Sequence, residues 1–378
     1  MYRLMEHEDL RMSYSFYRQL VVLLAALLIL GCDSSSTALQ IEKNLSGKGL
    51  KIHAKALKAI DVKQYDRAEA LLQNLLKEIT DKLGQTHPLL VEVNKNLGWL
   101  YFSQGRCSAA KHYYEEALTI KESTGEPDRP ETAELLTRLA EVYRKTGRYS
   151  PAQAFYRRAL AVMETNYGPE DLKLIPVLEN WALLYDRPGS YGEAETLFRR
   201  ALKISEKKFA PDDPEIIQLQ NQIAYFCNHE GKYAEAEKLY EKSLRDLKQK
   251  VGSEHPDSAL TLNGLALVRI SQGRFAQAEQ LLNQSLVMLE KSLGPDHIKI
   301  IPVLENMETY LFIYHPERAP ELEAVHKRHL DLIEKNFGTN HIDYVNALYK
   351  LSFFYVAIHL PQKAEETSRR AAQIEALL

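Results

Sequence analysis

Apolar positions in this chain recur at spacings of three, four and seven residues, the pattern of one face of an α-helix. The clearest stretches are residues 149–164, 191–206, 233–248 and 275–290. In each, two small residues seven apart lie on one face with a large residue between them. These triplets are Ala152, Tyr156 and Ala159; Ala194, Phe198 and Ala201; Ala236, Tyr240 and Ser243; and Ala278, Leu282 and Ser285. No alternating strand pattern competes, so the chain is predicted to be all-α.

Another helical segment precedes each of these helices, and a glycine turn separates the two. We call the preceding segment the first helix of a unit and the helix after the turn the second. The glycines lie 42 residues apart, at Gly105, Gly147, Gly189, Gly231 and Gly273. Each preceding segment carries a Leu-Ala or related pair near its middle: Leu97-Gly98, Leu139-Ala140, Trp181-Ala182, Ile223-Ala224 and Leu265-Ala266. A fixed period of this length is typical of tandem repeats. Because one unit cannot bury its apolar face alone, the units are expected to stack into a curved array.

The array is expected to hold about eight helix pairs between residues 50 and 378. The predicted units lie near residues 50–83, 84–124, 125–167, 168–209, 210–251, 252–293, 294–337 and 338–378. The first is weak and is interpreted as an N-terminal cap. The sixth full unit departs from the pattern, because "YHPERAP" at residues 314–320 replaces the glycine turn and two residues are inserted.

Two near-copies, "LIPVLENW" at residues 174–181 and "IIPVLENM" at residues 300–307, stand three periods apart. Each places a proline, Pro176 or Pro302, where sister helices have already begun. Proline is comfortable only in the first turn of a helix. We therefore expect these two helices to start late or to kink. A variant without a special role is the favoured interpretation, a widened groove at these units is the alternative, and whether the two prolines matter functionally stays open.

The N-terminal segment has a different composition. Residues 20–30 read "LVVLLAALLIL", an uncharged run well short of the ~20 residues that span a bilayer and typical of a secretory signal. With "ILGC" at residues 29–32 it resembles the lipobox of bacterial lipoproteins. This resemblance implies a signal peptide at residues 1–31, an acylated Cys32 at the mature N-terminus and a polar linker at residues 32–49. Cleavage elsewhere and an uncleaved anchor are the alternatives, and inner or outer membrane, and Met1 or Met12 as the start, stay open.

The repeat itself resembles the tetratricopeptide repeat of the kinesin light chain type. The resemblance rests on the 42-residue length, on the joints at residues 83–88 and 251–256, and on second helices similar to "EAExLYxRAL". It covers about residues 83–378. It implies a right-handed superhelix whose first helices line an inner groove that binds a protein or an extended peptide. Motor function is not implied, because residues 33–49 are too short and polar for a heptad-repeat segment.

The groove is expected to use first-helix residues beside the central pair. One position before the pair stand Asn96, Arg138, Asn180, Gln222, Gly264 and Asn306. Two positions after its first residue stand Trp99, Glu141, Leu183, Tyr225 and Leu267. Side-chain amides both donate and accept hydrogen bonds, so a row of them can bind a peptide backbone of any sequence. The kinesin resemblance implies that Asn96, Asn180 and Asn306 contact cargo peptide, and a merely solvated surface is the alternative.

Composition and motifs argue against several classes of function. The formal charge is −3 and no basic stripe is present, which argues against a nucleic-acid partner. Three cysteines are too few for a disulfide framework. Phosphate-loop, HExxH and GxSxG motifs are absent, so neither an enzyme nor a cofactor is expected.

His326 and His329 are three residues apart but have no evident third ligand. We interpret them as surface residues rather than as a metal site.

The sequence thus predicts a lipid-anchored envelope scaffold that is not an enzyme. The alternatives are a cytoplasmic adaptor and a regulatory subunit of an envelope enzyme. The sequence does not indicate an oligomeric state or name the partner.

Overall fold

The computed structural model describes residues 51, 52, 55, 56, 58, 65–124, 128–252 and 254–377. Over these residues the chain is helical and contains no strand. It divides into two compact units, Met1–Val93 and Asn94–Leu378. The expected signal peptide, Cys32 and the linker up to residue 49 lie outside the described residues. Within the described part, no helix is both long and apolar enough to cross a bilayer.

The first unit contains α3 (Tyr65–Leu83) and the beginning of α4 (Leu89–Ser103). Helix α3 buries Ala68, Leu72, Leu75 and Ile79. Their spacing of four, three and four residues places them on one helical face. Ala68 and Leu72 keep the phase of the small and large residues in the later second helices.

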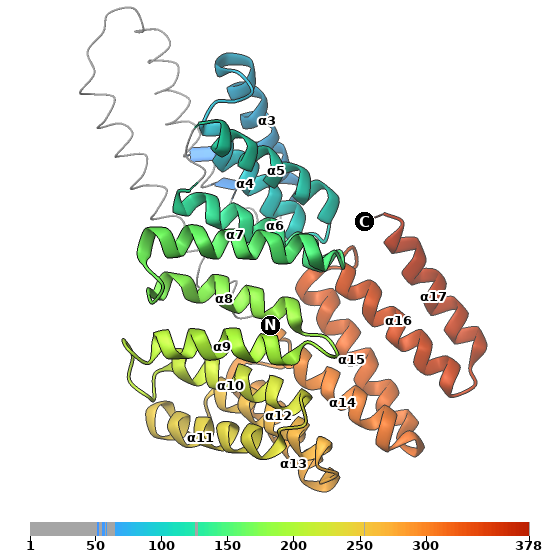
Figure 1. The fold of residues 1–378 in the computed structure, drawn as a ribbon. Helices are drawn as coiled ribbons and strands as arrows, with labels where there is room; N and C mark the ends of the chain where they lie inside the picture. The colour runs from blue at the N-terminus through green and yellow to red at the C-terminus, as the bar shows by residue number, and fades with distance from the viewer. Residues whose placement is uncertain are drawn as a thin grey trace, which may run out of the picture. The chain divides into compact units, whose positions relative to one another are not determined.

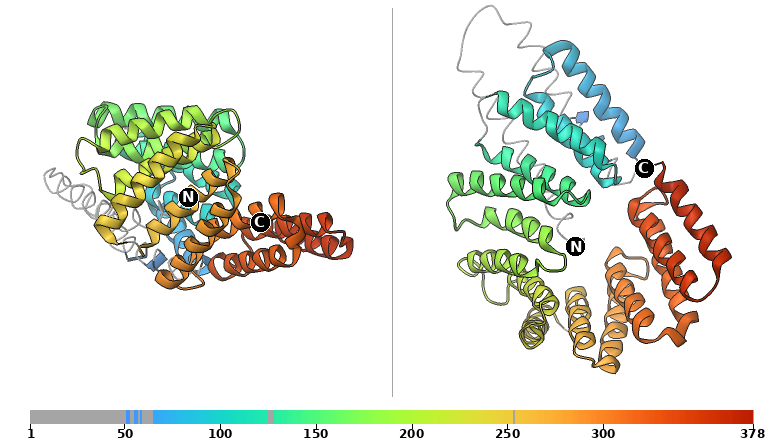
Figure 2. Two further views of the ribbon diagram at one scale, coloured as in Figure 1. Left: turned by 90° about the horizontal axis from the view of Figure 1, so that it is seen from below. Right: turned by 45° about the vertical axis from the view of Figure 1, so that its right-hand side comes forward.

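The second unit continues with alternating first and second helices, which are the even- and odd-numbered helices (Figure 1). Their bounds are α5 Cys107–Ser123, α6 Pro130–Lys145, α7 Tyr149–Tyr167, α8 Ile175–Ala182, α9 Tyr191–Ser205, α10 Pro214–His229, α11 Tyr233–Val251, α12 Pro256–Ser271, α13 Phe275–Leu293, α14 Ile301–Tyr314, α15 Ala319–Phe337, α16 Ile342–Ala357 and α17 Pro361–Glu375. Each first helix packs on the second helix that follows it, and the pairs stack in chain order (Figure 2). The prediction of an all-α array of stacked helix pairs is confirmed.

The packing follows the small and large positions read from the sequence. Ala194 and Ala201 of α9 are fully buried, and Phe198 between them is 2% exposed. The small residues of the first helices make room for the large side chains of the second helices. A Cβ built on Gly264 would lie only 2.5 Å from the ring of Tyr240, so this ring fills the space that a side chain on α12 would need.

The helices that contain Pro176 and Pro302 begin late, as expected. Helix α8 has 8 residues, whereas α10 has 16. A 3-10 turn, Leu172–Leu174, precedes α8, and another, Ile298–Ile300, precedes α14. Pro176 and Pro302 both stand in the first turn of their helices, where the missing N–H costs no helical hydrogen bond. Helix α8 also ends early, because Leu183–Tyr185 forms a third 3-10 turn.

The interpretation of His326 and His329 as surface residues is wrong. They are 7% and 2% exposed, and they lie on α15 against α14. The Nδ1 atoms of His326 and His329 are 3.0 Å and 2.8 Å from Oε1 of Glu308, which is itself 4% exposed. The buried carboxylate of Glu308 thus gives the Nδ1 atoms of both imidazoles a polar partner in the core.

Helix α17 presents a mostly polar surface. Only Ala364 and Ala371 are buried among its residues. The remainder of "PQKAEETSRRAAQIE" is mostly charged or polar.

Candidate functional site

The first helices form the inner layer of the second unit. Successive first helices contact one another directly, α6 with α8, α10 with α12, and α12 with α14. In the described part of the chain, no two successive second helices are in comparable contact. In a curved stack the layer with closer neighbours is the concave one. We call the solvent-facing side of this layer, carried by α4, α6, α8, α10, α12, α14 and α16, the inner face.

Polar side chains join neighbouring first helices across the inner face. One partner of each bridge stands two positions before the first residue of the central pair. The contacts are Lys95 Nζ to Glu134 at 3.3 Å, Asn221 Nδ2 to Thr261 Oγ1 at 2.9 Å, Asn306 Nδ2 to Asn263 Oδ1 at 3.0 Å and Lys350 Nζ to Glu305 at 2.9 Å. These bridges connect neighbouring first helices along the inner face.

The amides proposed from the sequence fall into two groups. Asn180 of α8 and Gln222 of α10 are half-buried, and neither side-chain amide hydrogen-bonds to any described residue. Their donors and acceptors are therefore available to a ligand. Asn306 is engaged by Asn263, and Asn96 is only 8% exposed. The structure thus offers two free amides one unit apart rather than a uniform row.

The other proposed groove residues give the centre of the inner face a polar character. Arg138 lies 3.3 Å from Glu141 on the same helix. The Tyr225 hydroxyl donates to Asp186 Oδ1 at 3.1 Å, and burial together with this carboxylate raises the pKa of Tyr225. Trp99 and Leu183 are half-buried.

The C-terminal end of the inner face carries exposed apolar side chains. Ile313, Phe353 and Val356 are 56%, 63% and 58% exposed, and the rings of Phe312 and Phe353 are 5.6 Å apart. Phe353 occupies the position in α16 that Trp99 and Tyr225 occupy in their helices. The two-residue insertion in the sixth unit breaks the 42-residue spacing, so this equivalence does not follow from the period alone.

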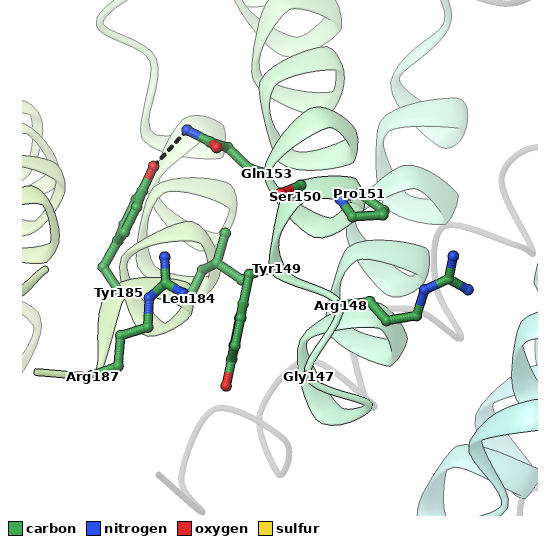
Figure 3. Close-up of a pocket in the computed structure, with 9 residues that line it drawn as sticks. All are labelled: Gly147, Arg148, Tyr149, Ser150, Pro151, Gln153, Leu184, Tyr185 and Arg187. Carbon is green, nitrogen blue, oxygen red and sulfur yellow. Dashed lines mark hydrogen bonds between the residues drawn. The ribbon is translucent and has the colours of Figure 1, made fainter.

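A cavity of about 440 Å³ lies at the edge of the array, between the start of α7 and the end of the 3-10 turn after α8 (Figure 3). We call it the turn-edge cavity, and it is lined by Gly147, Arg148, Tyr149, Ser150, Pro151, Gln153, Leu184, Tyr185 and Arg187.

Two contacts organise the turn-edge cavity. The Arg187 guanidinium stacks 4.4 Å from the centroid of the Tyr149 ring. The Gln153 amide donates to the Tyr185 hydroxyl at 2.8 Å. Arg148 extends away from this pair (Figure 3) and lies over the ring of Tyr143. Arg187 is therefore the cation inside the cavity.

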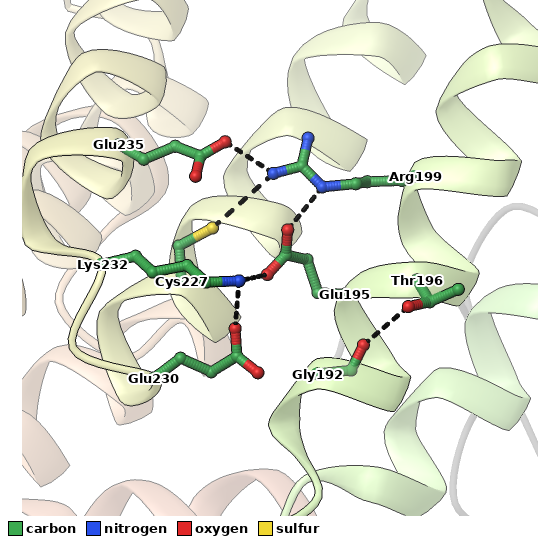
Figure 4. A network of polar contacts seen from close by, with 8 residues as sticks. All are labelled: Gly192, Glu195, Thr196, Arg199, Cys227, Glu230, Lys232 and Glu235. Carbon is green, nitrogen blue, oxygen red and sulfur yellow. Dashed lines mark hydrogen bonds and ion pairs between the residues drawn. The ribbon is translucent and has the colours of Figure 1, made fainter.

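The equivalent place one unit later holds an ion-pair network (Figure 4). Glu195 pairs with Arg199 and with Lys232, whose Nζ is 2.8 Å from Glu195 Oε2. Burial raises the pKa of Glu195, but hydrogen bonds from Lys232 and Arg199 outweigh burial and hold that pKa at about 2. The carboxylate therefore stays ionised throughout the physiological range.

Glu195, Cys227 and Glu235 bring two carboxylates and a thiol close together, a set that could in principle hold a metal ion. However, Arg199 already pairs with both carboxylates. Burial, with the carboxylates beside it, raises the pKa of the Cys227 thiol to about 12. Because ion pairs already engage both carboxylates, we interpret the network as structural.

The comparisons with known proteins agree with this architecture. The family model described as "Tetratricopeptide repeat" matches residues 53–123, 110–165, 131–207 and 215–291, which together cover more than half of the chain. Among curated proteins, no sequence matches.

Several solved structures are similar in fold. The apo form of the quorum sensor NprR from B. thuringiensis is 17% identical, with a TM-score of 0.55 over 97% of this chain and 99% of that one. A Rap protein complexed with Competence and Sporulation Factor is 15% identical, with a TM-score of 0.54 over 98% and 96%. A putative kinesin light chain from Podospora anserina is 22% identical, with a TM-score of 0.49 over 55% and 97%. The stacked helix pairs and the family match together show that this chain belongs to the tetratricopeptide repeat family.

Proposed function

We propose that this protein is a scaffold without enzymatic activity that binds an extended peptide or protein segment along its inner face. The observation that carries the proposal is the pair Asn180 and Gln222, two half-buried amides one unit apart with no hydrogen bond to the described chain. An extended backbone offers an N–H and a C=O at every residue, and each amide can meet both. The tetratricopeptide fold supports this role, since such arrays present long concave surfaces to their partners.

The side chains around these amides suit a peptide that carries both polar and apolar residues. Polar groups such as Arg138, Glu141 and Tyr225 lie on the N-terminal and central units, whereas Ile313 and Phe353 present an apolar surface at the C-terminal end. Exposed aromatic and aliphatic side chains of this size are typical of the centre of protein interfaces. Because polar bridges already fix neighbouring first helices, little of the protein needs to be ordered on binding.

We also propose that the array is held at a membrane of the bacterial cell envelope by an acylated Cys32. The support is the sequence from residue 20 to residue 32, where an uncharged apolar run ends at "ILGC". One acyl chain binds a bilayer only marginally, and two or more anchor a protein stably. A groove of the kinesin light chain type remains part of this proposal, with Asn180 facing the ligand, whereas Asn96 is buried and Asn306 is bound to Asn263.

The proposal is tested by capture of the partner from membranes by chemical crosslinking and mass spectrometry. Two lost hydrogen bonds of about 0.5–1.5 kcal/mol each reduce affinity by about 5- to 150-fold. Asn180→Ala with Gln222→Ala should therefore diminish capture while the melting temperature stays unchanged. The matched control is Asn283→Ala with Gln284→Ala, the same residue types exposed on the second helix α13. If capture survives the inner-face change, or is lost equally in the control, the inner face is not the binding surface.

A further inference from the structure

The second helices of the later units carry a glutamate at the same position. It is the fifth residue of α9, α11, α13 and of their counterpart α15, and it pairs with a cation from the following unit. The pairs are Glu195 with Lys232 at 2.8 Å, Glu237 with Arg274 at 3.5 Å, Glu279 with Arg318 at 2.8 Å and Glu323 with Lys363 at 3.4 Å. Each joint between these units therefore contains its own carboxylate.

Helix α7 lacks this carboxylate. Gln153 stands 42 residues before Glu195, so an uncharged amide occupies the place of the acid. This is the joint that contains the turn-edge cavity; Figure 3 shows this joint, without the glutamate, and Figure 4 shows the next joint, with Glu195.

A cation nevertheless stands in the turn-edge cavity. Arg187 forms no ion pair with any described residue, and its buried Nε has no hydrogen-bond partner there. The residue one unit later, His229, stacks on Tyr191 at 4.8 Å as Arg187 stacks on Tyr149. The acid next to Arg187 in the sequence, Asp186, accepts the hydrogen bond of Tyr225. The position that holds the paired cation in the next joint, Lys232, is Ser190 here; the cavity thus holds an arginine from a neighbouring position, with no ion-pair partner among the described residues, and no acid at the place of Glu195.

We propose that the turn-edge cavity binds an acidic side chain of the partner, whose carboxylate replaces the missing glutamate beside Arg187. This inference rests on the proposed function, because the acidic residue would belong to the segment that follows the inner face. Arginine binds carboxylates through parallel charge-assisted hydrogen bonds. The start of the 19-residue helix α7 lies in the same cavity, and its partial positive charge adds to the attraction.

The position of the cavity suits this role. Arg187 directly follows Asp186, which Tyr225 of the inner face contacts. The cavity therefore adjoins the inner face at its edge. A bound segment that passes over α8 and α10 can place one side chain in the cavity without leaving the inner face.

The test uses two fluorescein-labelled nonapeptides that differ only in three central residues, glutamates in one and glutamines in the other. Fluorescence anisotropy should show that the wild-type protein binds the glutamate peptide at least about tenfold more tightly, the effect of one charge-assisted hydrogen bond. Arg187→Gln should abolish the preference. Gln153→Glu should abolish it as well, because it supplies the carboxylate from within the chain.

The matched control is Gln280→Glu, which makes the same charge change at an exposed site on α13 and should leave the preference intact. Equal binding of the two peptides, or a preference that survives both Arg187→Gln and Gln153→Glu, would overturn the inference. If Arg187→Gln lowers the melting temperature, Gln153→Glu still decides the matter, since it keeps the arginine and its stacking on Tyr149. Partner capture that requires Asn180 and Gln222 but not Arg187 would reject the acidic site and leave the scaffold function standing.

Discussion

The buried carboxylate of the sixth unit makes the sharpest prediction about stability. Glu308 stands where the preceding unit has Ala266, 42 residues earlier. His326 and His329 stand where that unit has Leu282 and Ser285, shifted by the two inserted residues. Three core positions are therefore polar together in this one unit, and their side chains contact each other.

Removal of Glu308 should cost several kcal/mol. Glu308→Ala leaves two buried imidazoles without their acceptor, and loss of one partner of a buried pair typically costs about 3–5 kcal/mol. The pKa of Glu308 leads to a similar figure. Burial raises this pKa, but hydrogen bonds from His326 and His329 prevail and lower it from 4.5 to about 2. At 1.36 kcal/mol per unit, the shift corresponds to about 3 kcal/mol.

The sign of the pH dependence follows from the lowered pKa. The stabilisation by Glu308 is complete above the unfolded value of 4.5 and is lost as the pH falls toward about 2. A triple change, Glu308→Ala with His326→Leu and His329→Ser, restores the residues of the preceding unit. It should match or exceed wild-type stability, since replacement of a buried ion pair by packed apolar groups is often neutral or stabilising.

Native-state hydrogen exchange of the amides in α14, α15 and α16 is the suitable assay, because it reports local opening in a repeat array that need not unfold as one unit. Glu308→Ala should lower protection in these helices by about two orders of magnitude or more, whereas the triple variant should not. Unchanged protection in Glu308→Ala would show that the carboxylate does not stabilise the unit. A triple variant as unstable as the single one would show that the sixth unit is not packed like the fifth.

Two further predictions concern the packing and the anchor. Ala194→Leu overpacks a fully buried position of α9 and should cost about 1–3 kcal/mol; a thermal melt identical to wild type would mean that the helix contact is misassigned. Cys32→Ser should abolish palmitate labelling and leave the signal uncleaved or the protein released from membranes, because acylation requires the thiol. Labelling that persists in this variant would reject the lipobox interpretation.

Much of the fold could be predicted because its determinants are local and periodic. The 42-residue spacing of the turn glycines fixes the units, and positions such as Ala194 and Phe198 keep their phase within each second helix. Pro176 and Pro302 restrict their own backbone, so the late start of α8 and α14 could be deduced from one residue type. Each of these inferences needs only neighbours in the chain.

The functional surface depended on contacts that the sequence does not display. Asn263 and Asn306 were both visible, but their hydrogen bond follows from the distance between α12 and α14. The burial of His326 could not be deduced from "VHKRH", because its acceptor, Glu308, belongs to another helix. Comparison with the aligned position of Ala266 would have revealed the glutamate in a small-residue site. The significance of Gln153 depends on the ion pairs that Glu195 and its counterparts form, and the sequence alone does not show these pairs.

The central claim, that the inner face holds the partner, is tested most directly by photocrosslinking in intact membranes. A benzoylphenylalanine would replace Asn180 or Gln222 on the inner face and, in parallel, Asn283 or Gln284 on the exposed side of α13. Both inner positions should form an adduct with the same protein, and neither outer position should. Adducts formed only from Asn283 or Gln284, with none from Asn180 and Gln222, would contradict the claim.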